Sequence, residues 1–254
     1  QTPTPNPSAK FLNSSTFYKL GEMRPCCFVL LCFIMKGAKV TRHENDITLE
    51  PAGPPERSLV WMHGLGDSAE GWVDAFTEYD AVPATTRVVL LTAPVAPVTI
   101  NAGMRVTSWF DILGTAYNSS SVSFTEASTN AWRIIEAVDR EVAFHNGTAE
   151  KVFVGGFSQG AAMALHVGLD AVKAQLGGIL ALSGFLFEET ALRHPNTPVL
   201  IAHGSDDFMI PVSHAMRSYE RIKALPRVQI SEIAGMGHTI NPQVIKLVKA
   251  FFTK

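Results

Sequence analysis

The sequence predicts an α/β fold in which a mostly parallel central sheet is covered by helices on both faces. From residue 57 onward, short apolar runs alternate with segments whose apolar residues recur at helical spacing. Polar, glycine-containing turns follow several of these runs directly. The 254 residues are 46% hydrophobic and 17% charged, which is enough for a large core in one domain of ordinary size or slightly more.

The strands are predicted from continuous apolar runs, because strands that are buried on both faces lack a polar alternation. Most runs are separated by a segment long enough for a crossover connection, so the strands are expected to be parallel. The predicted strands are residues 58–63, 87–91, 151–154, 180–182, 198–202 and 228–233.

The longest predicted helix covers residues 123–146, where Ser123 and Glu126 have the spacing of a capping box. A final helix is expected to begin at Pro242, with Asn241 as its N-cap. The other helices are expected over residues 71–79, after residue 160 and over 212–225.

The first 50 residues are predicted to lie outside the domain, which is expected to cover residues 51–254. Residues 1–22 are rich in proline, serine, threonine and asparagine and are expected to be disordered. Residues 26–35 form a continuous apolar run that is too short to span a bilayer. Residues 23–38 have features of a signal peptide, and the same apolar run is equally compatible with an extra strand or helix on the domain. The extension is therefore interpreted as disordered or targeting.

Composition narrows the range of partners. The formal net charge is −2, so we expect no nucleic-acid partner, and no apolar run is long enough for stable transmembrane insertion. No Cys/His cluster has the spacing of a metal site, so no metal is expected.

The cysteine distribution favours a cytoplasmic protein. The three cysteines are Cys26, Cys27 and Cys32, so residues 33–254 cannot form an internal disulfide, which fits a reducing compartment. The secretory pathway is the alternative if residues 23–38 act as a signal, and Asn118 and Asn146 would then be glycosylation sites.

The most informative segment is Gly-Gly-Phe-Ser-Gln-Gly, residues 155–160, between a predicted strand and a predicted helix. Gly-x-Ser-x-Gly in that context is the pattern of a nucleophile elbow, a tight and strained turn that projects its serine from the end of a sheet. Gly156 and Gly160 leave the space that such a turn needs. Ser158 is therefore the candidate nucleophile.

Two further polar clusters follow strands. Asp206 and Asp207 follow strand 198–202, and His238 follows strand 228–233. The order serine, aspartate, histidine is the triad order of α/β-hydrolases. His238 suits a general base because its ordinary pKa lies near working pH. From the residues alone either aspartate could orient it, since consecutive side chains on an extended segment point in opposite directions.

Serine attack on a carbonyl also needs hydrogen-bond donors for the oxyanion. One is expected to be the backbone N–H of Gln159, at the first turn of the helix after the elbow. The other is expected from Leu65 in the loop His-Gly-Leu-Gly-Asp-Ser, residues 63–68, where we expect the His63 side chain to organise the loop.

Several blocks together resemble the acyl-protein thioesterases and their carboxylesterase and lysophospholipase relatives. The block Ser108-Trp-Phe-Asp-Ile112 best separates this family from other α/β-hydrolases, and the resemblance covers about residues 57–254. Its spacing selects Asp207 as the acid. The other blocks are residues 61–72, 93–101, 155–161, 203–211 and 235–238.

The resemblance implies an α/β-hydrolase fold and a serine hydrolase without a cofactor that cleaves fatty acyl thioester or ester bonds. The expected substrate is an acylated protein or a lipid, so the implied activity is protein depalmitoylation or lysophospholipid hydrolysis, with at most transient membrane contact. One alternative is a general carboxylesterase for small soluble esters. An alternative of another class is a non-catalytic ligand receptor on a hydrolase scaffold.

The acyl chain is expected to contact apolar residues on loops that converge at the strand ends. The loop at residues 183–189 carries Phe187 where the family often has proline, which affects the expected chain-length preference. The candidate substrate-binding residues are Trp109, Phe110, Phe185 and Leu186, with Leu65 beside them.

Overall fold

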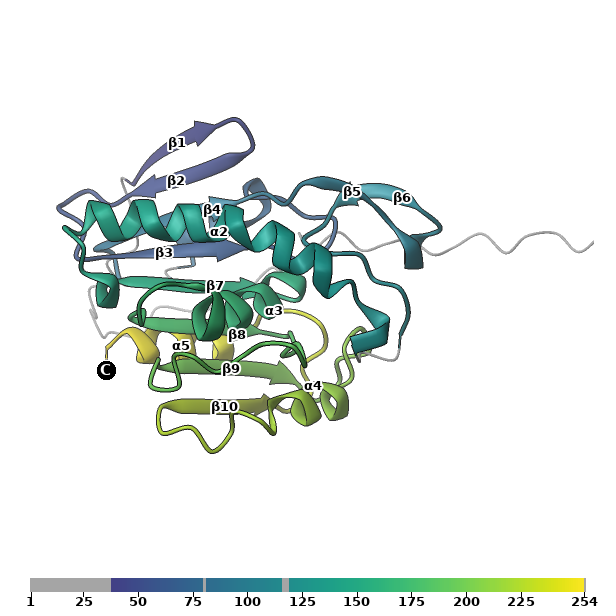
Figure 1. Cartoon of the computed structure of the whole chain (residues 1–254). Coiled ribbons are helices and arrows are strands. Elements are labelled where there is room, and N and C mark those ends of the chain that lie inside the picture. The colour runs from purple at the N-terminus through teal and green to yellow at the C-terminus, as the bar shows by residue number, and fades with distance from the viewer. Residues whose placement is uncertain (1–37, 80, 116–118, 254) are drawn as a thin grey trace, which may run out of the picture.

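A twisted eight-stranded sheet forms the centre of the molecule in the computed structural model, which describes residues 38–79, 81–115 and 119–253 (Figure 1). The strand order is β1-β2-β4-β3-β7-β8-β9-β10. The six strands from β4 to β10 in this order are parallel to one another, whereas β1 pairs antiparallel with β2 and β2 pairs antiparallel with β4. The predicted mostly parallel sheet is confirmed. Its strands are β1 (Lys39–His43), β2 (Asp46–Glu50), β3 (Arg57–Met62), β4 (Thr86–Leu91), β7 (Val152–Phe157), β8 (Gly178–Leu182), β9 (Val199–Gly204) and β10 (Val228–Ile233).

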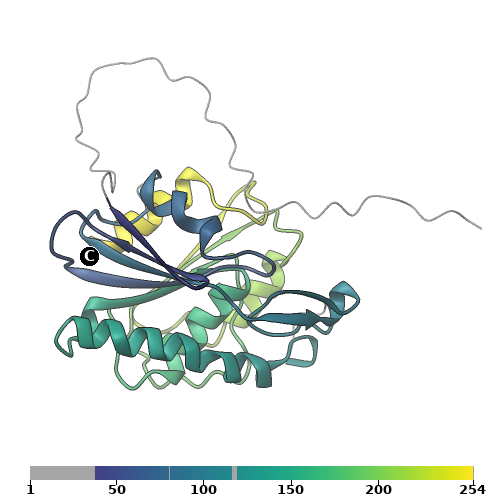
Figure 2. The ribbon, with the colours of Figure 1, turned by 90° about the horizontal axis from the view of Figure 1, so that it is seen from above.

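Helices cover both faces of this sheet (Figure 2). The first face carries α2 (Phe124–Phe144), α3 (Gln159–His166) and α4 (Val212–Tyr219). The second face carries α1 (Val73–Thr77) and α5 (Pro242–Phe252). Single turns complete the connections: η1 (Glu70–Trp72), η2 (Thr99–Asn101), η3 (Ser119–Ser121), η4 (Ala149–Lys151) and the π-helical turn η5 (Val167–Ala171).

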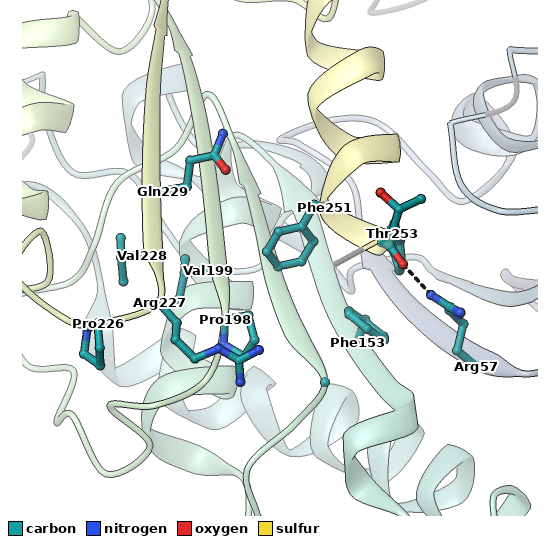
Figure 3. Close-up of a pocket in the computed structure, with 12 residues that line it drawn as sticks. Arg57, Phe153, Pro198, Val199, Pro226, Arg227, Val228, Gln229, Phe251 and Thr253 are labelled. Atoms are coloured by element: carbon teal, nitrogen blue, oxygen red, sulfur yellow. Dashed lines mark hydrogen bonds between the residues drawn. The ribbon is translucent and has the colours of Figure 1, made fainter.

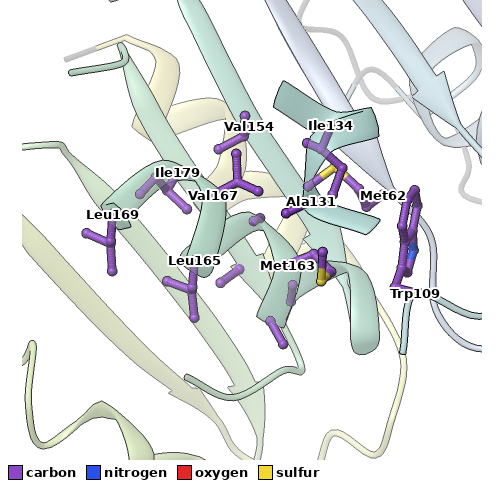
Figure 4. Packing of buried hydrophobic residues seen from close by; sticks show 14 of the residues in the cluster. Met62, Trp109, Ala131, Ile134, Val154, Met163, Leu165, Val167, Leu169 and Ile179 are labelled. Carbon is purple, nitrogen blue, oxygen red and sulfur yellow. The ribbon is translucent and has the colours of Figure 1, made fainter. Parts of the chain in front are cut away.

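The parallel strands are buried on both sides, so each supplies alternate residues to two separate cores. On β3, Val60 and Met62 pack beneath α2 and α3, while Leu59 and Trp61 pack beneath α1 and α5. Figure 4 shows the first of these cores, where α3 is buried on every side. Because α3 is completely enclosed, the position of its first residues is strongly determined.

The domain begins earlier than the predicted boundary at residue 51, because residues 39–50 belong to the central sheet. They form the hairpin β1–β2, and β2 pairs antiparallel with β4 through Ile47, Thr48 and Leu49. The two strands are five residues long and mix polar with apolar positions, so they lack the long apolar run by which the other strands were predicted. Residues 1–37, which include the predicted disordered segment and the apolar run, lie outside the described residues.

Three other local features differ from what the sequence predicts. A second hairpin, β5 (Val95–Val98) and β6 (Met104–Thr107), was not predicted, and α4 ends at Tyr219 rather than at residue 225. The capping box at α2 is only half formed: Ser123 accepts from the Glu126 N–H at 3.4 Å. The Glu126 carboxylate instead accepts from the Asp111 N–H at 2.7 Å, so it fixes a neighbouring loop.

Candidate active site

Ser158 lies in the sharp turn between β7 and α3 and has a positive φ, with φ 58° and ψ −118°. The flanking glycines are required by close backbone packing. A Cβ on Gly156 would lie 2.3 Å from the carbonyl carbon of Gly160, and a Cβ on Gly160 would lie 2.1 Å from the carbonyl oxygen of Met62. The serine conformation is one that L-residues rarely adopt and is held here by the packed turn.

His238 connects Ser158 to Asp207. Its Nε2 lies 2.9 Å from Ser158 Oγ, and its Nδ1 lies 2.7 Å from Asp207 Oδ2. The three residues follow β7, β9 and β10, whose carboxyl ends meet at one edge of the sheet. The imidazole ring packs against Phe157, with ring centroids 4.8 Å apart, and 17% of the His238 side chain remains exposed. The structure thus brings together the three side chains singled out in the sequence.

Asp207, rather than Asp206, faces the histidine. Its side chain is fully buried, and Oδ1 accepts the backbone N–H groups of Met209 and Ile210 at 2.9 and 2.8 Å. Burial acts to raise the pKa of Asp207, but the hydrogen bond and charge of His238 and the Ile210 N–H outweigh it and hold this pKa below its ordinary value. Asp206 is exposed and accepts from the Ser205 hydroxyl.

A second histidine, His203, lies beneath this carboxylate. Its Nε2 is 2.8 Å from the carbonyl oxygen of Ile210 and 3.4 Å from Asp207 Oδ2, and the ring is fully buried. Burial is the main reason that the pKa of His203 is lowered. A neutral ring that donates from Nε2 to Ile210 therefore supports the turn that holds Asp207.

The loop after β3 passes beside the serine. A Cβ on Gly64 would lie 3.2 Å from Ser158 Cβ, a tight contact that a glycine at this position avoids. The His63 ring is buried: Nδ1 donates to the Gly64 carbonyl at 2.6 Å, and Nε2 accepts from the Ala93 N–H at 2.9 Å. Burial lowers the pKa of His63, so the ring is neutral and braces the loop, as expected from the sequence.

The two residues predicted to donate to the oxyanion, Gln159 and Leu65, both lie on segments next to Ser158. Gln159 is the first residue of α3, where backbone N–H groups have no acceptor within the helix. Leu65 lies between Gly64 and the left-handed Gly66, φ 76°, in the loop beside the serine. Their role as donors stays a prediction.

The four candidate acyl-chain residues are buried in the first core. Phe110, Phe185 and Phe187 form an edge-to-face aromatic cluster with centroid distances of 5.1–6.2 Å. Trp109 is fully buried, and its indole Nε1 donates to the His63 carbonyl at 2.9 Å. Leu186 donates its N–H to Ser218 Oγ, which ties the loop to α4. Their contact with an acyl chain stays a prediction.

Sequence reasoning missed an exposed apolar pair at the site. Phe208 and Met209 follow Asp207 directly and are 91% and 57% exposed. Their signal in the sequence was present: the large apolar residues Phe-Met-Ile, 208–210, directly follow the polar Ser-Asp-Asp at a strand end.

A separate cavity of about 590 Å3 lies at the opposite edge of the sheet, where the parallel strands begin (Figure 3). Arg57, Phe153, Val199 and Val228, near the starts of four strands, contribute to its wall, and Phe251 closes it from α5. The length of β7 separates Phe153 from Ser158, roughly 16 Å at the usual rise per residue. This cavity therefore does not belong to the Ser158 site.

Two features are absent from residues 38–79, 81–115 and 119–253. No three His, Cys, Asp or Glu side chains there are grouped so that they could hold a metal ion. No helix in that part of the chain is both long and apolar enough to cross a membrane.

The sequence and the fold have known counterparts. Residues 43–254 match the phospholipase/carboxylesterase family, and the chain belongs to this family of α/β-hydrolases. Acyl-protein thioesterase 1 homolog 1 of Dictyostelium discoideum is 30% identical over 220 residues, which cover 83% of this chain and 93% of that protein. Acyl-protein thioesterase 1 of Saccharomyces cerevisiae is 30% identical over 215 residues, or 79% of this chain and 93% of that protein.

A solved structure shares the architecture. The crystal structure of Zea mays acyl-protein thioesterase 2 superposes with a TM-score of 0.70 at 24% identity, covering 82% of this chain and 97% of that chain. The fold class and the family resemblance predicted from the sequence are confirmed. The chain is a hydrolase of this family.

Proposed function

We propose that the protein is a serine thioesterase that removes long fatty acyl groups from acylated proteins, with Ser158, His238 and Asp207 as its catalytic triad. The observation that carries the proposal is the hydrogen-bonded chain from Ser158 Oγ through both ring nitrogens of His238 to Asp207. It is supported by family membership and by relatives named acyl-protein thioesterase at 30% identity.

Each triad residue has a defined step. His238 Nε2 takes the proton of Ser158 as Oγ bonds to the acyl carbonyl carbon, and Asp207 fixes the tautomer and stabilises the imidazolium. The N–H groups of Gln159 and Leu65 stabilise the oxyanion. The carbon–sulfur bond then breaks, His238 returns the proton to the leaving thiolate, and water releases the fatty acid from Ser158 by the same sequence of proton transfers.

The test is active-site labelling with a fluorophosphonate, competed by acyl thioesters of increasing chain length. Labelling should be lost in Ser158→Ala, and kcat/KM should rise with chain length, since each buried methylene contributes about 0.8 kcal/mol. A profile that is flat or falls from acetyl to octanoyl would assign the protein to esterases of small soluble esters. An unlabelled parent protein would assign it to non-catalytic receptors.

We also propose that the edge of the sheet that carries Ser158 makes transient contact with a membrane surface. The β5–β6 hairpin extends from this edge in Figure 1, and Val95, Ile100 and Met104 on it are 56%, 42% and 60% exposed. A fatty acyl group attached to a protein is presented at such a surface. Met104→Glu should weaken flotation with phosphatidylcholine vesicles, whereas Trp132→Glu, at a site on α2 that is 52% exposed, should not.

The cytoplasm is the compartment that we propose, because residues 33–254 lack cysteine and so need no oxidising environment. Asn146 gives the sharpest test. It begins an Asn-Gly-Thr sequence at an exposed turn after α2, so it would be accessible to glycosylation in the secretory pathway. A glycosidase-sensitive mass shift of the protein from cells would overturn this assignment.

A further inference from the structure

The two proposed oxyanion donors come from separate parts of the chain, Leu65 in the loop after β3 and Gln159 at the start of α3. Their spacing must be fixed before charge develops on the substrate, because a shift of about 1 Å in a catalytic group can cost about 10²-fold in rate. A third segment, residues 107–110, contacts both donor segments.

The segment 107–110 is joined to the donor loop on both sides of Leu65. One hydrogen bond is made before Leu65 and two after it, so the loop cannot rotate about a single anchor. The three bonds are Trp109 Nε1 to the His63 carbonyl at 2.9 Å, Gly66 N–H to the Thr107 carbonyl at 2.8 Å, and Thr107 Oγ1 to the Asp67 carbonyl at 2.6 Å.

The same segment is joined to the elbow through the side chain of Gln159, which is 2% exposed. Its Oε1 accepts the Trp109 N–H at 3.1 Å, and its Nε2 donates to the Phe110 carbonyl at 2.8 Å. Nε2 also lies 3.2 Å from Ser108 Oγ, whose own proton goes to the Phe110 carbonyl at 2.7 Å. Both N–H groups and the oxygen of the amide therefore form hydrogen bonds. A carboxylate at this position would place an acceptor oxygen against the Phe110 carbonyl oxygen, which is itself an acceptor.

The start of α3 also contacts the end of β3 directly. The α-carbon of Gly160 lies so close to the end of β3 that a Cβ there would be 2.1 Å from the Met62 carbonyl oxygen and 2.7 Å from that of His63. The start of α3, the end of β3 and the segment 107–110 thus each touch the other two. Such a closed set of contacts has little freedom to change the distance between two N–H groups that it carries.

We propose that the side chains of Gln159 and Trp109 are positioning residues that set the spacing of the two oxyanion donors. The inference rests on the proposed serine hydrolase function. Gln159 then acts twice, through its backbone N–H on the oxyanion and through its amide on the segment that holds the other donor. The indole of Trp109 supports the oxyanion loop through its hydrogen bond to the His63 carbonyl.

The test is Trp109→Phe, which removes the indole N–H and keeps a large aromatic ring. We expect kcat to fall about 10- to 100-fold with KM changed less than about twofold. Trp61→Phe is the matched control: its indole N–H is buried in the second core and has no hydrogen-bond partner in the described part of the chain. This variant should keep kcat within about twofold while losing thermal stability through the same reduction in ring size.

A second variant and a second readout separate positioning from loss of structure. Gln159→Glu should also lower kcat about 10- to 100-fold. For both variants, the affinity for a trifluoromethyl ketone, which forms a tetrahedral oxyanion adduct with the serine, should fall by the same factor as kcat/KM. For Trp109→Phe, which introduces no charge, the acidic limb of the pH–rate profile should stay in place, since the triad is untouched.

Two results would overturn the inference. In the first, Trp109→Phe and Gln159→Glu both keep kcat within about twofold of the parent. In the second, Trp61→Phe lowers kcat as much as Trp109→Phe does. Failure of the proposed function looks different, because the parent protein itself would then neither hydrolyse esters nor react with a fluorophosphonate.

Discussion

Two clusters at opposite edges of the sheet each contain a serine, a histidine and a carboxylate, in different arrangements. At the carboxyl edge, His238 lies between Ser158 and Asp207 and uses one ring nitrogen for each. At the amino edge, Ser58 lies between Glu141 and His145, with Oγ at 2.6 Å from Glu141 Oε2 and 3.0 Å from His145 Nε2.

The position of the serine decides what each cluster can do. Ser58 has one proton and gives it to Glu141, so His145 must donate to Ser58 and cannot act as its base. Glu141 is in turn held by Arg87 Nε at 3.0 Å, and Arg87 pairs with Glu50 as well, so the carboxylate is occupied. Ser58 is also fully buried in a regular strand, whereas Ser158 is partly exposed at a strained turn. Residue types alone therefore do not define a catalytic triad; the order of its hydrogen bonds does.

The largest difference between the clusters should appear when each serine loses its hydroxyl. Ser158→Ala should lower kcat by about 10³-fold or more, because triad residues act as a unit. The fold should be retained, since the partly exposed hydroxyl contributes little to packing. Rates on an activated ester and the thermal unfolding midpoint measure the two effects. Hydrolysis within tenfold of the parent would exclude the serine mechanism.

The acid of the carboxyl-edge cluster gives the second largest effect. Asp207→Asn keeps the shape but removes the charge that fixes and stabilises His238, so kcat should fall roughly 10²–10⁴-fold. Asp206→Asn is the adjacent control and should cost less than about tenfold, because its carboxylate is exposed and solvated. The reverse ranking in steady-state kinetics would move the acid by one residue and leave the serine and the histidine in place.

The sequence could predict the parts of the molecule that depend on long local patterns. Strands and helices with extended apolar runs, such as β7 and α2, lie within a few residues of their predicted bounds. The β1–β2 hairpin was missed because its strands are five residues long and lie at the edge of the sheet, where polar residues are tolerated. Its burial comes from pairing with β4, which is a tertiary contact.

In the candidate site, too, some features could be predicted from local sequence patterns and others depend on contacts between distant segments. The order of Ser158, Asp207 and His238 after three strands predicted that they would meet, because carboxyl ends of parallel strands share an edge. The contacts of the Gln159 amide join residues about 50 positions apart, so no local pattern contains them. The burial of Phe110 and Phe185 in an aromatic cluster with Phe187 likewise depends on packing between distant segments.

At the amino-edge cluster, loss of the serine hydroxyl should lower stability rather than activity, the opposite of the result expected at Ser158. Ser58→Ala should leave kcat within about twofold, because the Ser158 site is untouched. It should lower the free energy of unfolding by about 1–3 kcal/mol, since Glu141 loses a donor and His145 loses an acceptor in a buried setting. Urea denaturation followed by fluorescence measures the loss. If activity fell with stability unchanged, the two edges would not be independent.

The smallest expected effect is a pH dependence of stability from the buried histidine at the carboxyl edge. Burial lowers the pKa of His203, although the hydrogen bond to Ile210 and the charge of Asp207 act in the other direction. The unfolded chain has an ordinary histidine pKa of about 6.5 and therefore binds a proton that the native ring resists. Stability should accordingly be lost as the pH falls from 7 to 5, by at most about 1.4 kcal/mol per pH unit from this one group. His203→Gln keeps a donor for the Ile210 carbonyl but cannot titrate, so its unfolding free energy should fall less steeply over that range. Urea titrations of the parent and the variant at several pH values measure both slopes, and parallel curves would show that His203 is not the group responsible.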